Sequence, residues 1–330
     1  MALSVRRSCG FFLPLIAMLA LFGVLQPARM RALLADFSPR SLALVFIALL
    51  LRELLKAVRW AYFLRAAGIP ISAADGMTNF LAGQSVGVLP LGEVLRARLL
   101  REHDVPAYEV IPIVTMQTAC DVVAFALIAL IGAYRGIIVW WLAIVPLLLP
   151  VALAAIFSSD RVAEAVGRML RRHRATARFV PVEDDVRAHT LRLLRPRPLV
   201  CGVAFSLAVT AASAFVLVAL VDDLSSASLQ VGDALVALAL STLAGLVSLV
   251  PGGWGVADGS LSGLLSTFGV GAGVAFSVAL VYRFLDSIFR TLIGMVALFA
   301  RYRALFFGAA GDEPERQLQP IPIESVVGPD

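Results

Sequence analysis

The sequence predicts an all-α integral membrane protein: a polytopic helical bundle with two re-entrant, broken helical hairpins arranged as an inverted repeat. The bundle is predicted by composition and by segment length. Hydrophobic residues make up 60% of the 330 residues and charged residues 15%, whereas ordinary globular chains carry about 25% charged residues. Several segments reach the roughly 20 apolar residues that a helix needs to cross a bilayer. Two further apolar stretches, each interrupted by proline and glycine, predict the hairpins.

The predicted crossings follow one another along the chain. The first comes directly after Arg6 and Arg7 and has no small-x-small cleavage site, so we interpret it as a retained span and not as a secretory signal. The predicted crossings cover residues 8–25, 41–64, 108–132, 137–157, 198–221 and 271–300.

The distribution of arginine predicts the orientation in the membrane. Residues 158–197 form the only long polar segment of the sequence and are rich in arginine. The positive-inside tendency places this basic loop in the cytoplasm, and both termini follow it there. We therefore expect a multi-pass protein of the inner (plasma) membrane. The net charge of +5 suits an anionic membrane surface, and no nucleic-acid partner is expected.

The same pattern predicts the domain organisation. Residues 1–307 form one transmembrane domain, with a first repeat at about 41–132 and a second at about 198–305. The basic loop 158–197 separates the two repeats. Residues 308–330 are polar and contain several prolines, which predicts a disordered cytoplasmic tail.

Residues 74–103 and 232–268 are the two predicted re-entrant hairpins. Each stretch is apolar, breaks at a proline, Pro90 or Pro251, and then resumes. Irregular backbone at membrane depth is tolerated only where protein or a water-filled cavity surrounds it. We therefore expect both breaks to line a cavity. The glycines at the breaks are Gly92, Gly252, Gly253 and Gly255.

Acidic residues recur at matching positions in the two halves. An acid follows each break, Glu93 in the first half and Asp258 in the second, and 28 residues later each half has another, Asp121 or Asp286. The acids near the start of the two stretches are Asp75 and Asp233. Broken helices in an inverted repeat are typical of a transporter-like site near the membrane midplane.

Charged residues inside the predicted spans define the candidate site. Each costs about 2.5–3.5 kcal/mol at the bilayer centre, so its side chain should face the protein interior. They can pair with one another and hold the bundle together, or surplus arginines can bind an anionic group such as phosphate. For Arg59, snorkelling to the membrane interface is a further alternative. The candidate head-group and cavity residues are Glu93, Arg96, Asp121, Asp258, Arg283, Asp286 and Arg59.

Catalysis has little support in the sequence. The histidines His103, His173 and His189 fall in predicted cytoplasmic segments and lack metal-ligand spacing. No nucleophile and base pair can be identified, so we expect no enzyme activity, no cofactor and no metal site. Acid pairs at 184–185 and 222–223 leave open the alternative of a lipid-modifying transferase, or an accessory protein of a lipid biosynthesis pathway.

Four segments carry a resemblance to a known family. They are GEVLRARLL (92–100), PGGWGVAD (251–258), LLSTFGV (264–270) and ALVYRFLDSIFRTLIG (279–294). These segments resemble the signatures of the flippase-like family, the transmembrane region of lysylphosphatidylglycerol synthases, over residues 8–305. The resemblance implies translocation of a membrane phospholipid or another amphiphilic lipid between leaflets, with lipid-biosynthesis enzymes as candidate partners.

The resemblance also assigns motif positions. Arg283 and Arg96 become the expected head-group contacts, and Glu93 and Asp258 the expected gate or counter-charge. The break residues Pro90, Gly92, Pro251, Gly252, Gly253 and Gly255 become the close-approach backbone. The family usually has Arg-Glu where this chain has Ala257 and Asp258, which argues against a strongly anionic or aminoacylated lipid. We also expect no cytosolic aminoacyl-transfer domain, and therefore no synthesis of lysyl-lipid by this chain.

Overall fold

A computed structural model describes residues 37–86, 92–103, 105–137, 140–148, 183–248, 253 and 255–307, and these residues form helices joined by turns. The all-α fold predicted from the sequence is confirmed for this part of the chain. Several predictions fall outside the described residues. They concern the span 8–25, most of 137–157, most of the basic loop, the tail 308–330, and the break residues Pro90, Pro251 and Gly252.

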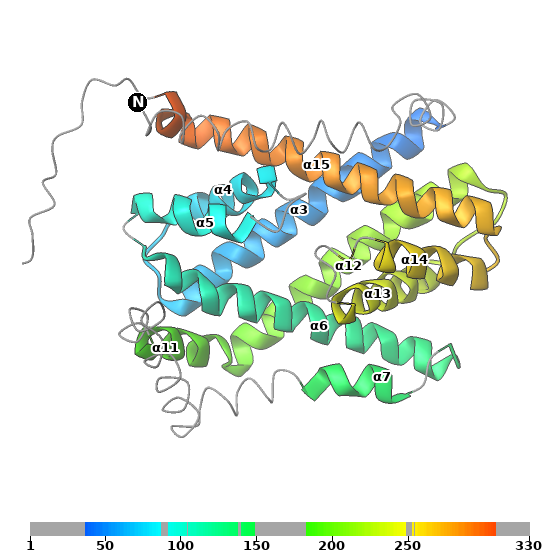
Figure 1. Cartoon of the computed structure of the whole chain (residues 1–330), viewed down its shortest axis with the longest axis horizontal. Helices are drawn as coiled ribbons and strands as arrows, with labels where there is room; N and C mark the ends of the chain where they lie inside the picture. Colours follow the sequence, from blue (N-terminus) through cyan, green and yellow to red (C-terminus); the bar gives the residue numbers. More distant parts are fainter. Residues whose placement is uncertain are drawn as a thin grey trace, which may run out of the picture.

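Long helices form the framework of the bundle, some along its long axis and some oblique to it (Figure 1). They are α3 (Pro39–Ala67), α6 (Val110–Tyr134), α12 (Pro196–Leu224) and α15 (Ala272–Phe307). By length and composition α6, α12 and α15 can cross a membrane. At about 1.5 Å per residue, the 29 residues of α3 also exceed a hydrocarbon core of roughly 30 Å. These helices coincide with the predicted spans 41–64, 108–132, 198–221 and 271–300.

Local sequence signals set the limits of α3. Ser38 caps its N-terminus by accepting a hydrogen bond from the backbone N–H of Ser41, and Pro39 takes the first helical position, where no donor is lost. Gly68 ends the helix with φ 93°, a left-handed conformation that glycine adopts without a Cβ clash. The helix is therefore bounded by its own sequence at both ends.

Short helices follow α3 and α12 in the same order. α4 (Ala73–Gly83), the 3-10 turn η1 (Gln84–Val86) and α5 (Gly92–Leu100) lie between α3 and α6, and α13 (Val231–Val247) and α14 (Val256–Thr267) lie between α12 and α15. Asp75 and Asp233 both occupy the third residue after the helix N-cap, as the repeat predicts. Figure 1 places α4 and α5 at one end of the bundle and α13 and α14 at the other. Their interpretation as re-entrant hairpins stays a prediction.

The remaining described elements are short. They are η2 (Arg101–His103), η3 (Ala107–Glu109), α7 (Trp140–Ile144), η4 (Val145–Leu148) and α11 (Glu183–Leu193). α11 is the described part of the predicted basic loop. It packs against α3 and α6, and its Arg192 donates a hydrogen bond of 3.1 Å to the carbonyl of Ala67 at the end of α3.

Each short helix pair packs against a long helix of the opposite half. α4 and η1 contact α15, and α13 contacts α6. At the first of these contacts Gly294 lies so close to the backbone of Gln84 and Ser85 that an added Cβ would lie 2.1 Å from the Ser85 nitrogen. The two halves therefore interlock through their short helices.

The two largest apolar clusters of the core have charged residues of α3 between them. Val45 and Leu49 belong to a cluster with α12, α13, α14 and α15. Between Ala57 and Ala67, most buried apolar residues of α3 belong to a second cluster with α4 and α6. The buried residues Arg52 and Glu53 fall between these segments. This charged layer leads to the candidate site.

Candidate functional site

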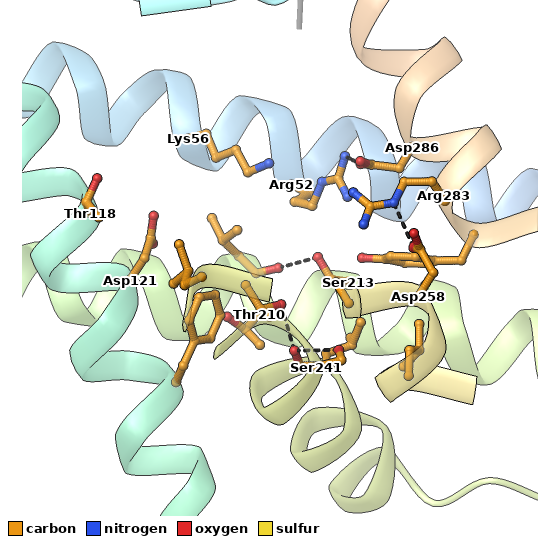
Figure 2. Close-up of a pocket in the computed structure, with 18 residues that line it drawn as sticks. Arg52, Lys56, Thr118, Asp121, Thr210, Ser213, Ser241, Asp258, Arg283 and Asp286 are labelled. Carbon is orange, nitrogen blue, oxygen red and sulfur yellow. Dashed lines mark hydrogen bonds and ion pairs between the residues drawn. The ribbon is translucent and has the colours of Figure 1, made fainter. Parts of the chain in front are cut away.

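A cavity of about 370 Å³ lies in the middle of the bundle, beside the charged layer of α3. Its walls come from α3, α6, α12, α13, α14 and α15, so both halves of the chain contribute (Figure 2). Ligand pockets in proteins span roughly 300–1,000 Å³. The cavity is therefore large enough for a small polar group.

An ion-pair network joins α3 to α15 at the edge of the cavity. Arg52 pairs with Glu53 at 2.8 Å and also with Asp286 of α15. Lys56 lies 3.1 Å from Glu53, and Arg290 lies 2.7 Å from Asp286. Arg52 and Asp286 also line the cavity, where Figure 2 shows them next to Arg283. The two acids thus share three cations.

Glu53 also connects this network to the first short helix pair. Its second carboxylate oxygen accepts a hydrogen bond of 2.8 Å from the Gln84 side chain in η1. Glu53 is fully buried, and both of its oxygens are engaged. Because a buried carboxylate is stable only when it is paired and hydrogen-bonded, these contacts account for its ionised form in the core.

The second short helix pair carries its own ion pair. Asp258, in the first turn of α14, pairs with Arg283 of α15 at 2.8 Å. Its other oxygen accepts a hydrogen bond of 3.1 Å from the backbone N–H of Gly255, which satisfies a donor at the start of α14. Gly253 and Gly255 have φ values of 66° and 79°, where glycine is favoured. The glycines thus place Asp258 against α15.

Arg59 is held inside the protein. Its guanidinium pairs with Asp121 of α6, with one nitrogen 3.2 Å from the second carboxylate oxygen, and it also donates to Ser206 of α12. The side chain is 1% exposed. The snorkelling alternative therefore does not describe its position. Asp121, which is partly exposed, reaches the cavity.

Glu93 and Arg96 lie away from the cavity. They pair with each other at 3.1 Å on α5. The Arg96 guanidinium lies 4.1 Å from the ring centre of Phe80 and 5.2 Å from that of Trp60. Arg96 also fills the space beside Gly83, where an added Cβ would lie 2.4 Å from its side chain. The structure gives this arginine a packing position against two neighbouring aromatic rings.

Gly92 explains how α5 approaches α4. An added Cβ at Gly92 would meet the carbonyl oxygen of Gly83 at 3.1 Å, so a side chain here would push the two helices apart. The candidate residues thus divide into two groups. Asp121, Asp258, Arg283 and Asp286 line the cavity and Arg59 supports it, whereas Gly92, Glu93 and Arg96 belong to the α4 and α5 contact.

Hydroxyl side chains form a part of the cavity that the sequence analysis missed. They lie on α6, α12 and α13 (Figure 2). On α12 a detectable signal exists, because Ser206, Thr210 and Ser213 recur on one face of an otherwise apolar helix. The serine and threonine residues that line the cavity are Thr118, Thr210, Ser213, Ser241 and Thr242, and Tyr282 of α15 adds a phenolic hydroxyl.

The charges around the cavity do not balance. We define the buried charge cluster as the described ionised residues that line the cavity together with their ion-pair partners. Its cations are Arg52, Lys56, Arg59, Arg283 and Arg290, and its acids are Glu53, Asp121, Asp258 and Asp286. The cluster therefore carries one positive charge more than it has acids to neutralise.

A comparison with known protein families agrees with this architecture. The family described as the lysylphosphatidylglycerol synthase TM region matches residues 8–294. The chain belongs to this family. The match includes the whole buried charge cluster and both short helix pairs. No curated protein matches the sequence. Family membership and the apolar helices place the chain in a membrane.

Proposed function

We propose that this member of the lysylphosphatidylglycerol synthase TM region family translocates a lipid or lipid-linked intermediate across the inner membrane. The head group would occupy the cavity while the acyl chains stay in the bilayer. One observation carries the proposal: an ionised cavity of about 370 Å³ lies inside helices that are otherwise apolar. Polar residues at membrane depth are costly and mark substrate pathways.

The charge cluster favours an anionic group in the substrate. Its five cations and four acids leave one positive charge without an acid. Because an uncompensated charge in a low-dielectric interior is costly, one negative charge from a ligand lowers the free energy of the cluster. A phosphodiester carries one such charge and matches the donors of arginine.

Arg283 is the residue that we assign to the phosphate. It lines the cavity, its side chain is 21% exposed, and its partner Asp258 belongs to the second short helix pair. A phosphate that binds Arg283 would compete with Asp258 and loosen α14 from α15. This exchange of partners links occupancy of the cavity to movement of the helix pair.

The arrangement in the membrane belongs to the same proposal. We place the basic loop and both termini in the cytoplasm, following the positive-inside tendency. The loops that precede α4 and follow α5 then lie on the cytoplasmic side. The loops around α13 and α14, the short helix pair that lines the cavity, lie on the opposite side.

Reconstitution of the full chain tests this function. Vesicles containing acyl-labelled phospholipids should show faster exchange of label between leaflets when the protein is present, with the lipid mass unchanged. Arg283→Ala should abolish this exchange, while Arg301→Ala should keep it. Arg301 is the matched control because it lies on the same helix as Arg283 and also forms an ion pair, with Asp75 of α4. Its side chain is 55% exposed and lies outside the cavity. Equal exchange by both variants, or a new covalent lipid product, would contradict the proposal.

A further inference from the structure

The serine and threonine hydroxyl groups of the cavity all donate their hydrogen to the backbone. Each O–H donates to a backbone carbonyl of its own helix at 2.7–3.1 Å. A hydroxyl whose hydrogen is used in this way keeps its oxygen lone pairs as acceptors. This acceptor wall consists of Thr118, Thr210, Ser213, Ser241 and Thr242. Ser213 is also hydrogen-bonded to the Tyr282 side chain of α15, and the other four hydroxyl oxygens offer acceptors to a ligand that carries donors.

The cations lie on a different wall. Arg52 and Lys56 come from α3 and Arg283 from α15, whereas the acceptor wall is built from α6, α12 and α13. Figure 2 shows the two sets of side chains on different helices around the same space. A ligand that spans the cavity therefore meets donors for an anion on one wall and acceptors on the other.

We propose that the cavity selects phospholipid head groups that carry hydrogen-bond donors beyond the phosphate. The phosphate would lie against Arg52, Lys56 and Arg283, and an ammonium or hydroxyl group against the acceptor wall. Head groups that end in a quaternary ammonium or an alkyl ester would be discriminated against. This inference rests on the proposed function, because it uses the same cavity for the lipid head.

The physical reason lies in the cost of unpaired polar groups. A site built to hydrogen-bond a substrate discriminates strongly against an analogue without the matching group, because its buried polar atoms then stay unpaired. Thr210 and Ser241 line the cavity and are 4% and 3% exposed, so a ligand group that hydrogen-bonds to their oxygens would be shielded from water. A choline group satisfies neither residue, since it carries no N–H.

Two matched pairs of lipids test the inference on the full chain. Phosphatidylethanolamine and phosphatidylcholine have the same net charge but differ in N–H donors. Phosphatidylglycerol and phosphatidylethanol have the same net charge but differ in hydroxyl donors. Binding is measured by native mass spectrometry of the detergent-solubilised protein, and transport by leaflet exchange in vesicles. The donor-bearing member of each pair should bind about tenfold better, as two or three hydrogen bonds would give.

Variants of the acceptor wall connect the preference to these residues. Thr210→Val and Ser241→Ala remove the hydroxyl oxygen with little change in shape. Each variant should bring the ratio of binding between the two lipids of a pair closer to one. Lys56→Gln is the matched control on the cationic wall. It should weaken binding of all four lipids and leave the ratio within each pair intact.

The outcomes separate this inference from the proposed function. Equal binding of both members of a pair by the wild-type protein overturns the inference, even when transport occurs. Selective binding without any transport keeps the head-group preference and overturns the translocation proposal. Binding of none of the four lipids overturns both. The wild-type comparison needs no variant, so a variant that fails to fold does not affect the result.

Discussion

Some single residues in this bundle lie at backbone contacts that are too close for any added side-chain atom. Gly294 of α15 is the sharpest case, because α15 and η1 meet there backbone to backbone. Gly294→Ala would place its Cβ 2.1 Å from the Ser85 nitrogen and 2.6 Å from the Gln84 carbonyl carbon, and backbone atoms cannot move aside cheaply. We expect a clear fall in the midpoint of thermal unfolding in detergent.

Gly263→Ala is the matched control for this prediction. Gly263 lies inside α14, and no heavy atom lies within 4 Å of the point that an added Cβ would occupy. Alanine is favoured over glycine in a helix by about 0.5–1 kcal/mol, so this variant should unfold at the same temperature as wild type or higher. Equal midpoints for the two variants would contradict the close approach of α15 and η1.

Glu53 is the acid on which the charge cluster depends. Glu53→Gln removes a fully buried negative charge that pairs with Arg52 and Lys56, and the cluster then has two uncompensated positive charges. Breaking a buried ion pair on one side costs about 3–5 kcal/mol. We therefore expect a strongly reduced unfolding midpoint, measured in detergent as above.

An exposed ion pair gives the comparison for Glu53. Asp75 pairs with Arg301 at 3.3 Å, and the arginine side chain is 55% exposed. Since exposed pairs contribute about 0–1 kcal/mol, Asp75→Asn should change the midpoint only slightly. If Glu53→Gln were as mild as Asp75→Asn, the account of the buried charge cluster would be wrong.

At the scale of elements, the arrangement predicts which loops share a side of the membrane. Single cysteines at Ser72 and Ala107, in a background without the native cysteines, should react with an impermeant maleimide from the cytoplasmic side. Cysteines at Ser226 and Gly271 should react from the opposite side. The reason is that each short helix pair leaves the bilayer on the side where it began. Labelling of Ser72 and Ala107 from opposite sides would exclude a re-entrant first hairpin.

The helices were predictable because their signals are local. Hydropathy located α3, α6, α12 and α15, and proline with glycine located the interruptions between the short helices. Matching acids also indicated that the two halves are built alike, and Asp75 and Asp233 do take equivalent positions. Such patterns depend on residues close together in the chain, so no tertiary information was needed.

The side-chain partners were only partly predictable, because they depend on how distant helices meet. Arg96 follows a break in the sequence as Asp258 does, yet it packs against Phe80 and Trp60 while Asp258 faces the cavity. No periodicity distinguishes the two cases. The hydroxyls of α13 were missed for a similar reason, since serine and threonine in an apolar helix usually bond to their own backbone.

At the scale of the whole molecule, the fold places a charged layer between two apolar clusters. The bundle keeps its ionised residues away from lipid because α3, α6 and α15 all turn their charged faces toward one cavity. The cost of this layer is offset by mutual ion pairing and, in the proposed function, by the substrate phosphate. In that proposal, stability and transport depend on the same residues.

The exchange of partners at Arg283 gives a prediction at this scale. The double variant Asp258→Asn with Arg283→Gln keeps the polar contact between α14 and α15 but removes the charge that attracts phosphate. We expect it to fold with a near-normal unfolding midpoint. It should exchange lipid at least about tenfold more slowly than wild type, because the loss of one charge-assisted contact costs about that factor. Wild-type exchange rates in this variant would remove Arg283 from the proposed pathway.

The most direct test of the central claim is photo-crosslinking of a phospholipid that carries a photoreactive group on its head. Full-length protein in vesicles is irradiated with this lipid, and the adducts are mapped by mass spectrometry. The account predicts adducts on the cavity-lining segments of α12 and α13, around Thr210 and Ser241, which unlabelled lipid should suppress. Adducts confined to outward-facing positions such as Val296, which is 68% exposed, would contradict it.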